Sequence, residues 1–103
     1  MEQKTSSGRT NLSYDDVKDI IRLICKNKKS QEYVLIKVNE VQTLLKIKKN
    51  KEVSTPTIRS KGISHRGYFE KKYPDACKYK YTGDTNKRGL LVNPEKMLEE
   101  LEQ

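Results

Sequence analysis

The C-terminal third of the chain contains an alternation that limits the folds open to it. At positions 77–81, a cysteine and two tyrosines alternate with two lysines, so the two sets fall on opposite faces of an extended strand. Residues 82–89 are rich in turn formers, and Leu90-Leu91-Val92 predicts a returning strand. We therefore expect a β-hairpin with a long, basic tip, which places the chain outside the all-α class.

Helical periodicity dominates the first quarter. Apolar residues at 17, 20, 21 and 24 form one face of a helix predicted over about Tyr14–Lys26. Ser13 is the expected N-cap, and Asp16 occupies the position from which a carboxylate completes a capping box.

A strand and a short helix are expected next. Glu32–Val38 is β-branched and aromatic, which favours a strand. Asn39 resembles an N-cap for a helix over about Glu40–Ile47. Its apolar face is expected to consist of Val41, Leu44 and Leu45, with Ile47 as a possible fourth member. Residues 48–51 predict a turn.

Thr55 followed by Pro56 signals another helix start, with Thr55 at the N-cap. This helix is expected over Pro56–Lys61, with Ile58 turned inward. Gly62 and Gly67 weaken the pattern beyond it, and two interpretations stay open: one broken or shifted helix, or a helix followed by a separate loop and helix. The second piece, at 64–73, offers two core candidates, Tyr68 and Phe69.

The chain is predicted to end in a helix started by Asn93-Pro94. This C-terminal segment, residues 93–103, presents Met97, Leu98 and Leu101 on one face, which either covers the core or pairs with a second copy as a homodimer. Of these two interpretations, we favour dimerisation.

The length of 103 residues favours one domain, expected over residues 12–92 and preceded by a disordered arm at 1–11. No apolar run is long enough for a membrane span or a secretory leader, so we expect an intracellular protein without a membrane partner, in the cytoplasm and nucleoid, or in the nucleus if eukaryotic. Cys25 and Cys77 are read as buried thiols. With His65 as the only histidine, no common zinc-finger spacing, other metal cluster, cofactor loop or catalytic constellation is present, and we expect a non-enzymatic protein.

The net charge of +8 is concentrated in the middle of the chain. Residues 1–45 carry a net +2, residues 46–90 a net +9 and residues 91–103 a net −3. A concentrated positive block is typical of a protein that binds nucleic acid, although a merely lysine-rich surface gives the same composition.

The expected order of elements is helix, short strand, helix, turn, helix, basic hairpin, helix. This resembles the winged helix-turn-helix domains that bind DNA, in element order, element lengths and charge placement. The resemblance implies a small α+β fold with a C-terminal hairpin wing and a final helix. It also implies that the helix at Thr55 is the recognition helix in the major groove and that residues 78–90 are the wing.

Twelve residues on these two elements are the candidate contacts with nucleic acid. Arg59 and Ser60 would reach base edges, the start of the helix would bind phosphate, and the hairpin lysines would contact the backbone. The full set is Ser54, Thr55, Thr57, Arg59, Ser60, Lys61, His65, Arg66, Lys78, Lys80, Lys87 and Arg88.

Double-stranded DNA is the partner expected first, for a transcriptional regulator or a replication or partition factor. The alternatives are an RNA-binding or ribosome-associated module and a protein–protein adaptor with an acidic partner. A simpler interpretation of the hairpin lysines is that they keep the protein soluble and prevent the edge strand from pairing with another chain. Tyr79 and Tyr81 are expected to pack in the core rather than to stack on bases.

Overall fold

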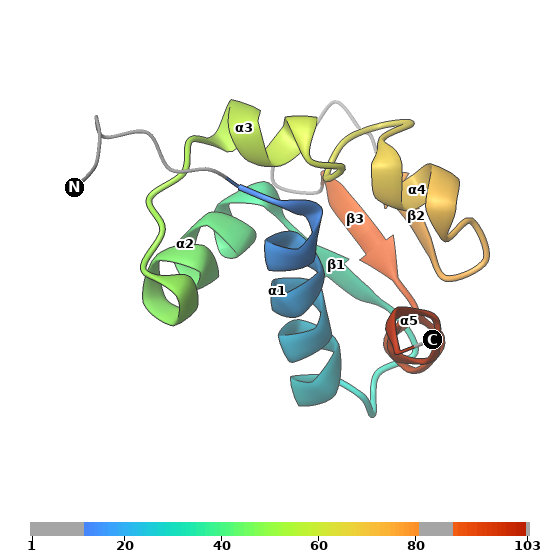
Figure 1. Ribbon diagram of the computed structural model, residues 1–103. Helices are drawn as coiled ribbons and strands as arrows, with labels where there is room; N and C mark the ends of the chain where they lie inside the picture. Colours follow the sequence, from blue (N-terminus) through green and yellow to red (C-terminus); the bar gives the residue numbers. More distant parts are fainter. Residues whose placement is uncertain (1–11, 81–87, 103) are drawn as a thin grey trace.

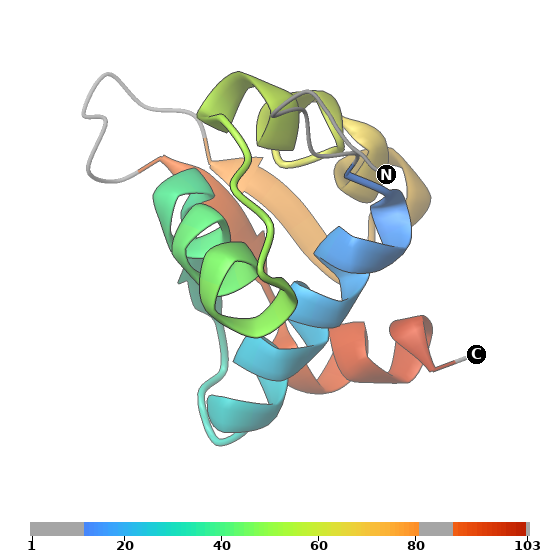
Figure 2. The ribbon, with the colours of Figure 1, turned by 60° about the vertical axis from the view of Figure 1, so that its left-hand side comes forward.

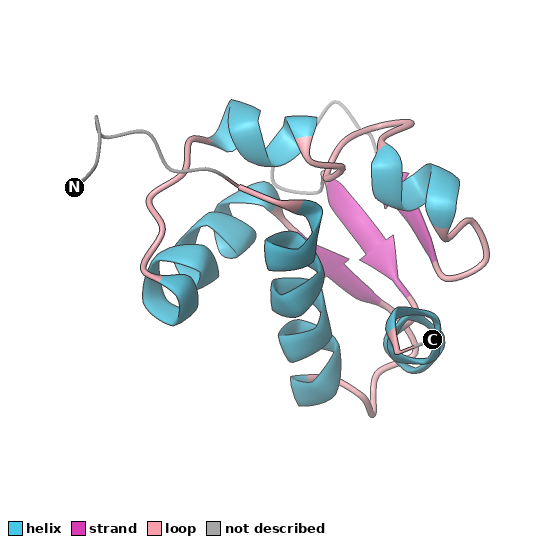
Figure 3. Cartoon of the chain, viewed as in Figure 1, coloured by secondary structure: helices cyan, strands magenta, loops and turns pink. Residues whose placement is uncertain are grey.

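A computed structural model describes residues 12–80 and 88–102. In these ranges the chain is a small α+β domain with five helices and a three-stranded antiparallel sheet (Figures 1 and 3). The elements, in chain order, are α1 (Tyr14–Asn27), β1 (Val34–Ile36), α2 (Val38–Lys49), α3 (Thr55–Ser60), α4 (Tyr68–Lys72), β2 (Cys77–Lys80), β3 (Gly89–Val92) and α5 (Pro94–Leu101). The predicted disordered arm, residues 1–11, lies outside the described residues, as do Tyr81 and Lys87.

Helix α1 begins as its sequence predicts. The Ser13 hydroxyl accepts a hydrogen bond from the Asp16 N–H at 3.1 Å, and the Asp16 carboxylate accepts one from the Ser13 N–H at 3.2 Å. This capping box satisfies backbone donors that have no partner within the helix. The apolar face from Val17 to Cys25 is buried, and the predicted helix is confirmed with its end one residue later, at Asn27.

The sheet has the strand order β1-β3-β2, with both pairings antiparallel. The two strands predicted for the hairpin are therefore confirmed, and β3 lies between β2 and β1. The register places Leu35, Leu91 and Lys78 in one row across the sheet. The predicted strand at Glu32–Val38 is shorter at both ends in the structure, since β1 begins at Val34 and Val38 already belongs to α2.

The core lies between one face of the sheet and the helices. Val34, Ile36, Leu90 and Val92 are buried on that face, and α1 packs against both α2 and α5. Figures 1 and 2 show α1 running alongside the sheet, and α5 lies near the C-terminal half of α1. Both cysteines are buried free thiols, as predicted.

Two predictions about α2 are wrong. The helix starts at Val38 with Lys37 as its N-cap, and no side chain caps it, so Asn39 is inside the helix and exposed. The buried face consists of Val38, Val41 and Leu45. Ile47 lies two positions beyond Leu45, roughly 200° around the helix, and is therefore 67% exposed instead of facing the core.

Helix α3 begins one residue earlier than predicted. Its N-cap is Ser54, with Thr55 and Pro56 in the first turn, so the assignment of Thr55 as N-cap is wrong. Ile58 is fully buried, as expected. The second predicted piece, 64–73, contracts to Tyr68–Lys72, and within it Phe69 is fully buried whereas Tyr68 is only half-buried.

The last helix is capped as predicted, because the Asn93 side chain accepts a hydrogen bond from the Lys96 N–H at 3.1 Å. Met97, Leu98 and Leu101 are buried within the chain itself, Met97 completely. These side chains cover the domain's own core, which was one of the two interpretations of this segment. They leave little apolar surface to meet a second copy.

Candidate nucleic-acid interface

Helix α3 anchors itself through Ile58 and presents polar side chains outward. Arg59 and Ser60 are exposed. The hydroxyls of Ser54 and Thr57 lie 2.8 Å apart, and the Ser60 hydroxyl donates to the Thr57 carbonyl at 2.7 Å. Three of the candidate hydroxyls are thus engaged within the helix, whereas the Arg59 guanidinium has no carboxylate partner in the described part of the chain. Arg59 is the α3 side chain best placed to contact a ligand.

A turn interrupts the chain after α3. Gly62 has φ +107°, and the buried Ile63 follows it. A Cβ at Gly62 would lie 2.6 Å from a ring carbon of Phe69, so close packing and backbone conformation both require glycine here. Of the two interpretations that the sequence left open, the structure shows the separate helix, loop and helix.

His65 and Arg66 lie in this turn and are exposed. Arg66 has φ +59°, a left-handed conformation uncommon for a residue with a side chain. Its N–H donates to Glu70 Oε1 at 2.6 Å, and the other oxygen of that carboxylate accepts from the Tyr79 N–H at 3.0 Å. Glu70 therefore ties the turn to β2.

The hairpin separates its lysines from the core. Lys78 and Lys80 are exposed, whereas Tyr79 is 8% exposed and belongs to the core, as expected. Arg88 is half-buried just before β3. Lys87 was predicted as a contact and lies outside the described residues.

Helix α3 lies at the end of the molecule where β2 ends and β3 begins. In both ribbon views, the end of β2 and the start of β3 approach α3, while α5 lies at the opposite end (Figures 1 and 2). Arg59 on α3 is thus at the same end of the molecule as Lys80, the last residue of β2, and Arg88, the residue before β3.

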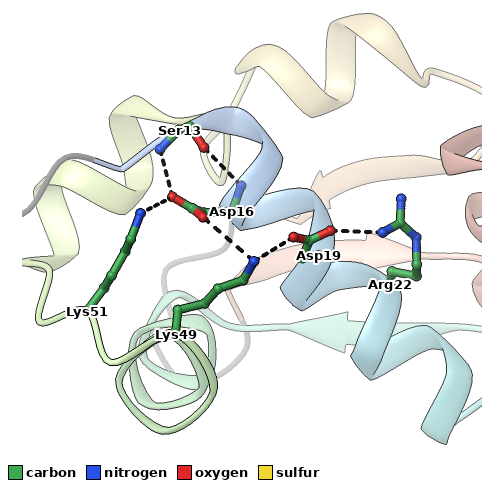
Figure 4. A network of polar contacts seen from close by, with 6 residues as sticks. All are labelled: Ser13, Asp16, Asp19, Arg22, Lys49 and Lys51. Carbon is green, nitrogen blue, oxygen red and sulfur yellow. Dashed lines mark hydrogen bonds and ion pairs between the residues drawn. The ribbon is translucent and has the colours of Figure 1, made fainter.

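Part of the basic block seen in the sequence is occupied by internal ion pairs. Lys49 Nζ lies 2.6 Å from Asp19 and 3.7 Å from Asp16, and Lys51 pairs with Asp16 (Figure 4). The ammonium of Lys51 holds the pKa of Asp16 below its ordinary value, and Lys49 does the same for Asp19. These two lysines join α2 and the following loop to α1, so they belong to the fold rather than to a binding surface.

A second basic surface escaped the sequence analysis. The Tyr14 and Tyr68 rings stack with centroids 4.1 Å apart, and three lysine ammonium groups lie over them. We call this group, made of Tyr14, Lys18, Lys61, Tyr68 and Lys72, the tyrosine–lysine cluster. Tyr14/Lys18 and Tyr68/Lys72 are each four residues apart on a helix, which is a signal that the sequence contained. The sequence does not show that the Tyr14 and Tyr68 rings come into contact in the folded chain.

No protein-family model matches this chain, and no curated protein or solved structure is significantly similar to it.

Within residues 12–80 and 88–102, no helix is both long enough and apolar enough to cross a bilayer. In the same ranges, no three side chains among His, Cys, Asp and Glu gather in an arrangement that could hold a metal ion.

Proposed function

We propose that this chain is a non-enzymatic protein that binds double-stranded DNA in the manner of a winged helix-turn-helix domain, as a transcriptional regulator or a replication or partition factor. The observed order of elements supports the proposal, because a short strand between the first two helices pairs with a C-terminal hairpin. The pairing of β1 with β3 attaches the hairpin to the helical part of the domain.

One observation carries the proposal. Helix α3, which carries the exposed Arg59, lies at the end of the molecule where β2 ends and β3 begins (Figure 2). In this assignment, Arg59 reads a base edge, where arginine paired with guanine is the commonest specific contact. Lys78 and Lys80 contact phosphates, which position a protein on the duplex without selecting a sequence.

The first experiment compares ligands. Fluorescence anisotropy is measured with a duplex DNA, the matching single strand and a structured RNA of equal length, at about 50 mM salt and micromolar protein. We expect the duplex to bind most tightly, with log K falling by about 0.9 per log unit of salt for each phosphate contacted. Equal affinity for duplex and RNA would favour the RNA-binding alternative, and no binding to either would overturn both.

The second experiment assigns roles. Arg59→Ala should lower affinity for a selected site by about 1–3 kcal/mol while affinity for random duplex changes little. Arg59→Lys keeps the charge but loses the two-pronged geometry, so it should lose selectivity as well. Lys96→Ala is the matched control, because Lys96 is exposed on α5 at the opposite end. A uniform loss across all sequences for Arg59→Ala would mean that Arg59 contacts phosphate instead.

A further inference from the structure

The tyrosine–lysine cluster is assembled from three separate parts of the fold. Tyr14 lies in the first turn of α1, Lys61 directly follows α3, and Tyr68 begins α4. The two rings stack at an interplanar angle of 28°, and Tyr14 remains 37% exposed. The stack therefore joins α1 to α4 at the surface.

Each lysine of the cluster is held over a ring. Lys61 Nζ lies 4.9 Å from the Tyr14 centroid, and Lys72 Nζ and Lys18 Nζ lie 5.6 and 5.8 Å from the Tyr68 centroid. A cation over a ring face is attracted by the ring quadrupole, which favours this position of the ammonium group over others.

These positive charges are not neutralised by the part of the chain that the structure describes. Across 12–80 and 88–102, no carboxylate lies within ion-pair distance of Lys18, Lys61 or Lys72. This contrasts with Lys49 and Lys51, which face the aspartates of α1 (Figure 4). The cluster is thus a concentrated positive site, in which the Lys18 ammonium also faces the hydroxyls of Tyr68 and Tyr73.

The cluster is continuous with the proposed DNA-binding surface. Lys61 follows Arg59 and Ser60 at the end of α3, and its ammonium reaches the ring of Tyr14. From there the stacked rings lead to Lys72 on α4 and Lys18 on α1. A polyanion lying along α3 would meet these charges next.

We propose that the tyrosine–lysine cluster binds the phosphodiester backbone of duplex DNA beyond the segment contacted by α3. This inference rests on the proposed function and adds a second contact area to it. The tyrosines hold the lysine ammonium groups near the surface before DNA binds. Binding then costs less side-chain conformational entropy than it would with freely moving lysines. Phosphate contacts of this kind raise the affinity for every sequence alike.

The test uses the full chain and a random-sequence duplex longer than one helical turn. The double variant Lys18→Gln with Lys72→Gln removes two charges that were not among the candidates on α3 or the hairpin. We expect the slope of log K against log salt to become shallower by about two units, because each phosphate that is no longer neutralised lowers it by about 0.9. The control, Lys26→Gln with Lys96→Gln, removes two exposed lysines outside the cluster and should leave most of the slope unchanged.

Two further variants separate binding from folding. Lys18→Arg with Lys72→Arg keeps both charges and should retain the wild-type slope, so that the shallower slope of the Gln variant follows the loss of charge. Tyr68→Leu removes the ring under Lys18 and Lys72 and should weaken binding while the charge stays the same. Thermal unfolding by circular dichroism checks that each variant is folded.

The outcomes are distinguishable. If wild type binds duplex and the Lys18→Gln, Lys72→Gln variant binds with unchanged affinity and slope, the cluster only stabilises the fold and the inference is wrong. If the control pair lowers the slope equally, the effect is one of net charge and the inference is likewise wrong. If the wild-type protein binds no duplex at all, both the proposed function and this inference are wrong.

Discussion

Lys49 Nζ on α2 lies 2.6 Å from Asp19 Oδ2 on α1, and this ion pair links two helices that are separated by a strand. Asp19 also accepts from Arg22 at 2.8 Å, and Arg22 in turn lies 3.4 Å from the Leu101 carbonyl oxygen of α5. Asp16, one turn earlier, serves both the N-terminal cap and Lys51. Acidic groups of α1 therefore hold several elements in place (Figure 4).

Replacement of Asp16 should lower stability and change its pH dependence. Asp16→Ala removes half of the capping box and the partner of Lys51, and we expect a loss of about 1 kcal/mol at pH 7. The folded pKa of Asp16 lies below its ordinary value of 3.8, so its contribution is present above about pH 4 and is lost as the pH falls through the lowered value. Urea unfolding at pH 7 and near pH 3 measures both effects.

Asp15→Ala is the matched control for this experiment. Asp15 is exposed in the same first turn, and no ion pair involves it among the described residues. It should lose only a small helix-dipole contribution. An equal loss in both variants, with the same pH profile, would contradict a specific role for Asp16.

Truncation of Met97 should show that α5 is part of the core. Met97 is fully buried, and Met97→Ala is expected to lower the free energy of unfolding by about 2–5 kcal/mol. Ile47→Ala, at an apolar but 67% exposed position, should change it by less than about 0.5 kcal/mol. A Met97→Ala protein of wild-type stability whose sedimenting mass is halved would instead place α5 in a dimer interface.

Gly62→Ala should be strongly destabilising, because the new Cβ would lie 2.6 Å from Phe69 and the backbone keeps φ at +107°. We expect a loss of about 1–3 kcal/mol, measured by urea unfolding. A Phe69→Leu background removes part of the steric conflict, so the double variant should be less destabilised than the sum of the two singles. Simple additivity would show that the backbone conformation alone is responsible.

The two thiols should react only when the protein unfolds. Burial raises the pKa of Cys25 to about 11 and that of Cys77 to about 12, and the Cys77 thiol donates to the Phe69 carbonyl at 3.2 Å. Because the thiolate is the nucleophile, an aromatic disulfide reagent at pH 8 should label native protein slowly and denatured protein at once. A thiol labelled within the mixing time in native protein would contradict this.

Local signals in the sequence predicted most of the elements. Ser13 and Asn93 were recognised as caps because an N-cap bonds within its own first turn, and the alternation at 77–81 identified a strand because its period is local. The start of α2 was missed because no side chain caps it. Ile47 was misplaced although the helical period itself puts it roughly 200° around the helix from Leu45.

The candidate site was less accessible to sequence reasoning, because charge along a chain does not reveal which charges meet. Lys49 and Lys51 count towards the basic block yet face the aspartates of α1. Tyr14 and Tyr68 are distant in sequence and come together only through tertiary packing. Arg59, Lys78 and Lys80 are exposed as the candidate assignment requires, and their role in binding stays a prediction.

Glu70 holds the turn after α3 at a fixed distance from strand β2. Its two carboxylate oxygens accept the backbone N–H groups of Arg66 and Tyr79, so the turn after α3 and the edge strand cannot shift apart without losing a charge-assisted hydrogen bond. The backbone positions of Arg66 and Tyr79, from which the neighbouring cationic side chains project, consequently keep their separation. A ligand that bridges the turn and the edge strand would meet two backbone segments whose separation is set before it arrives.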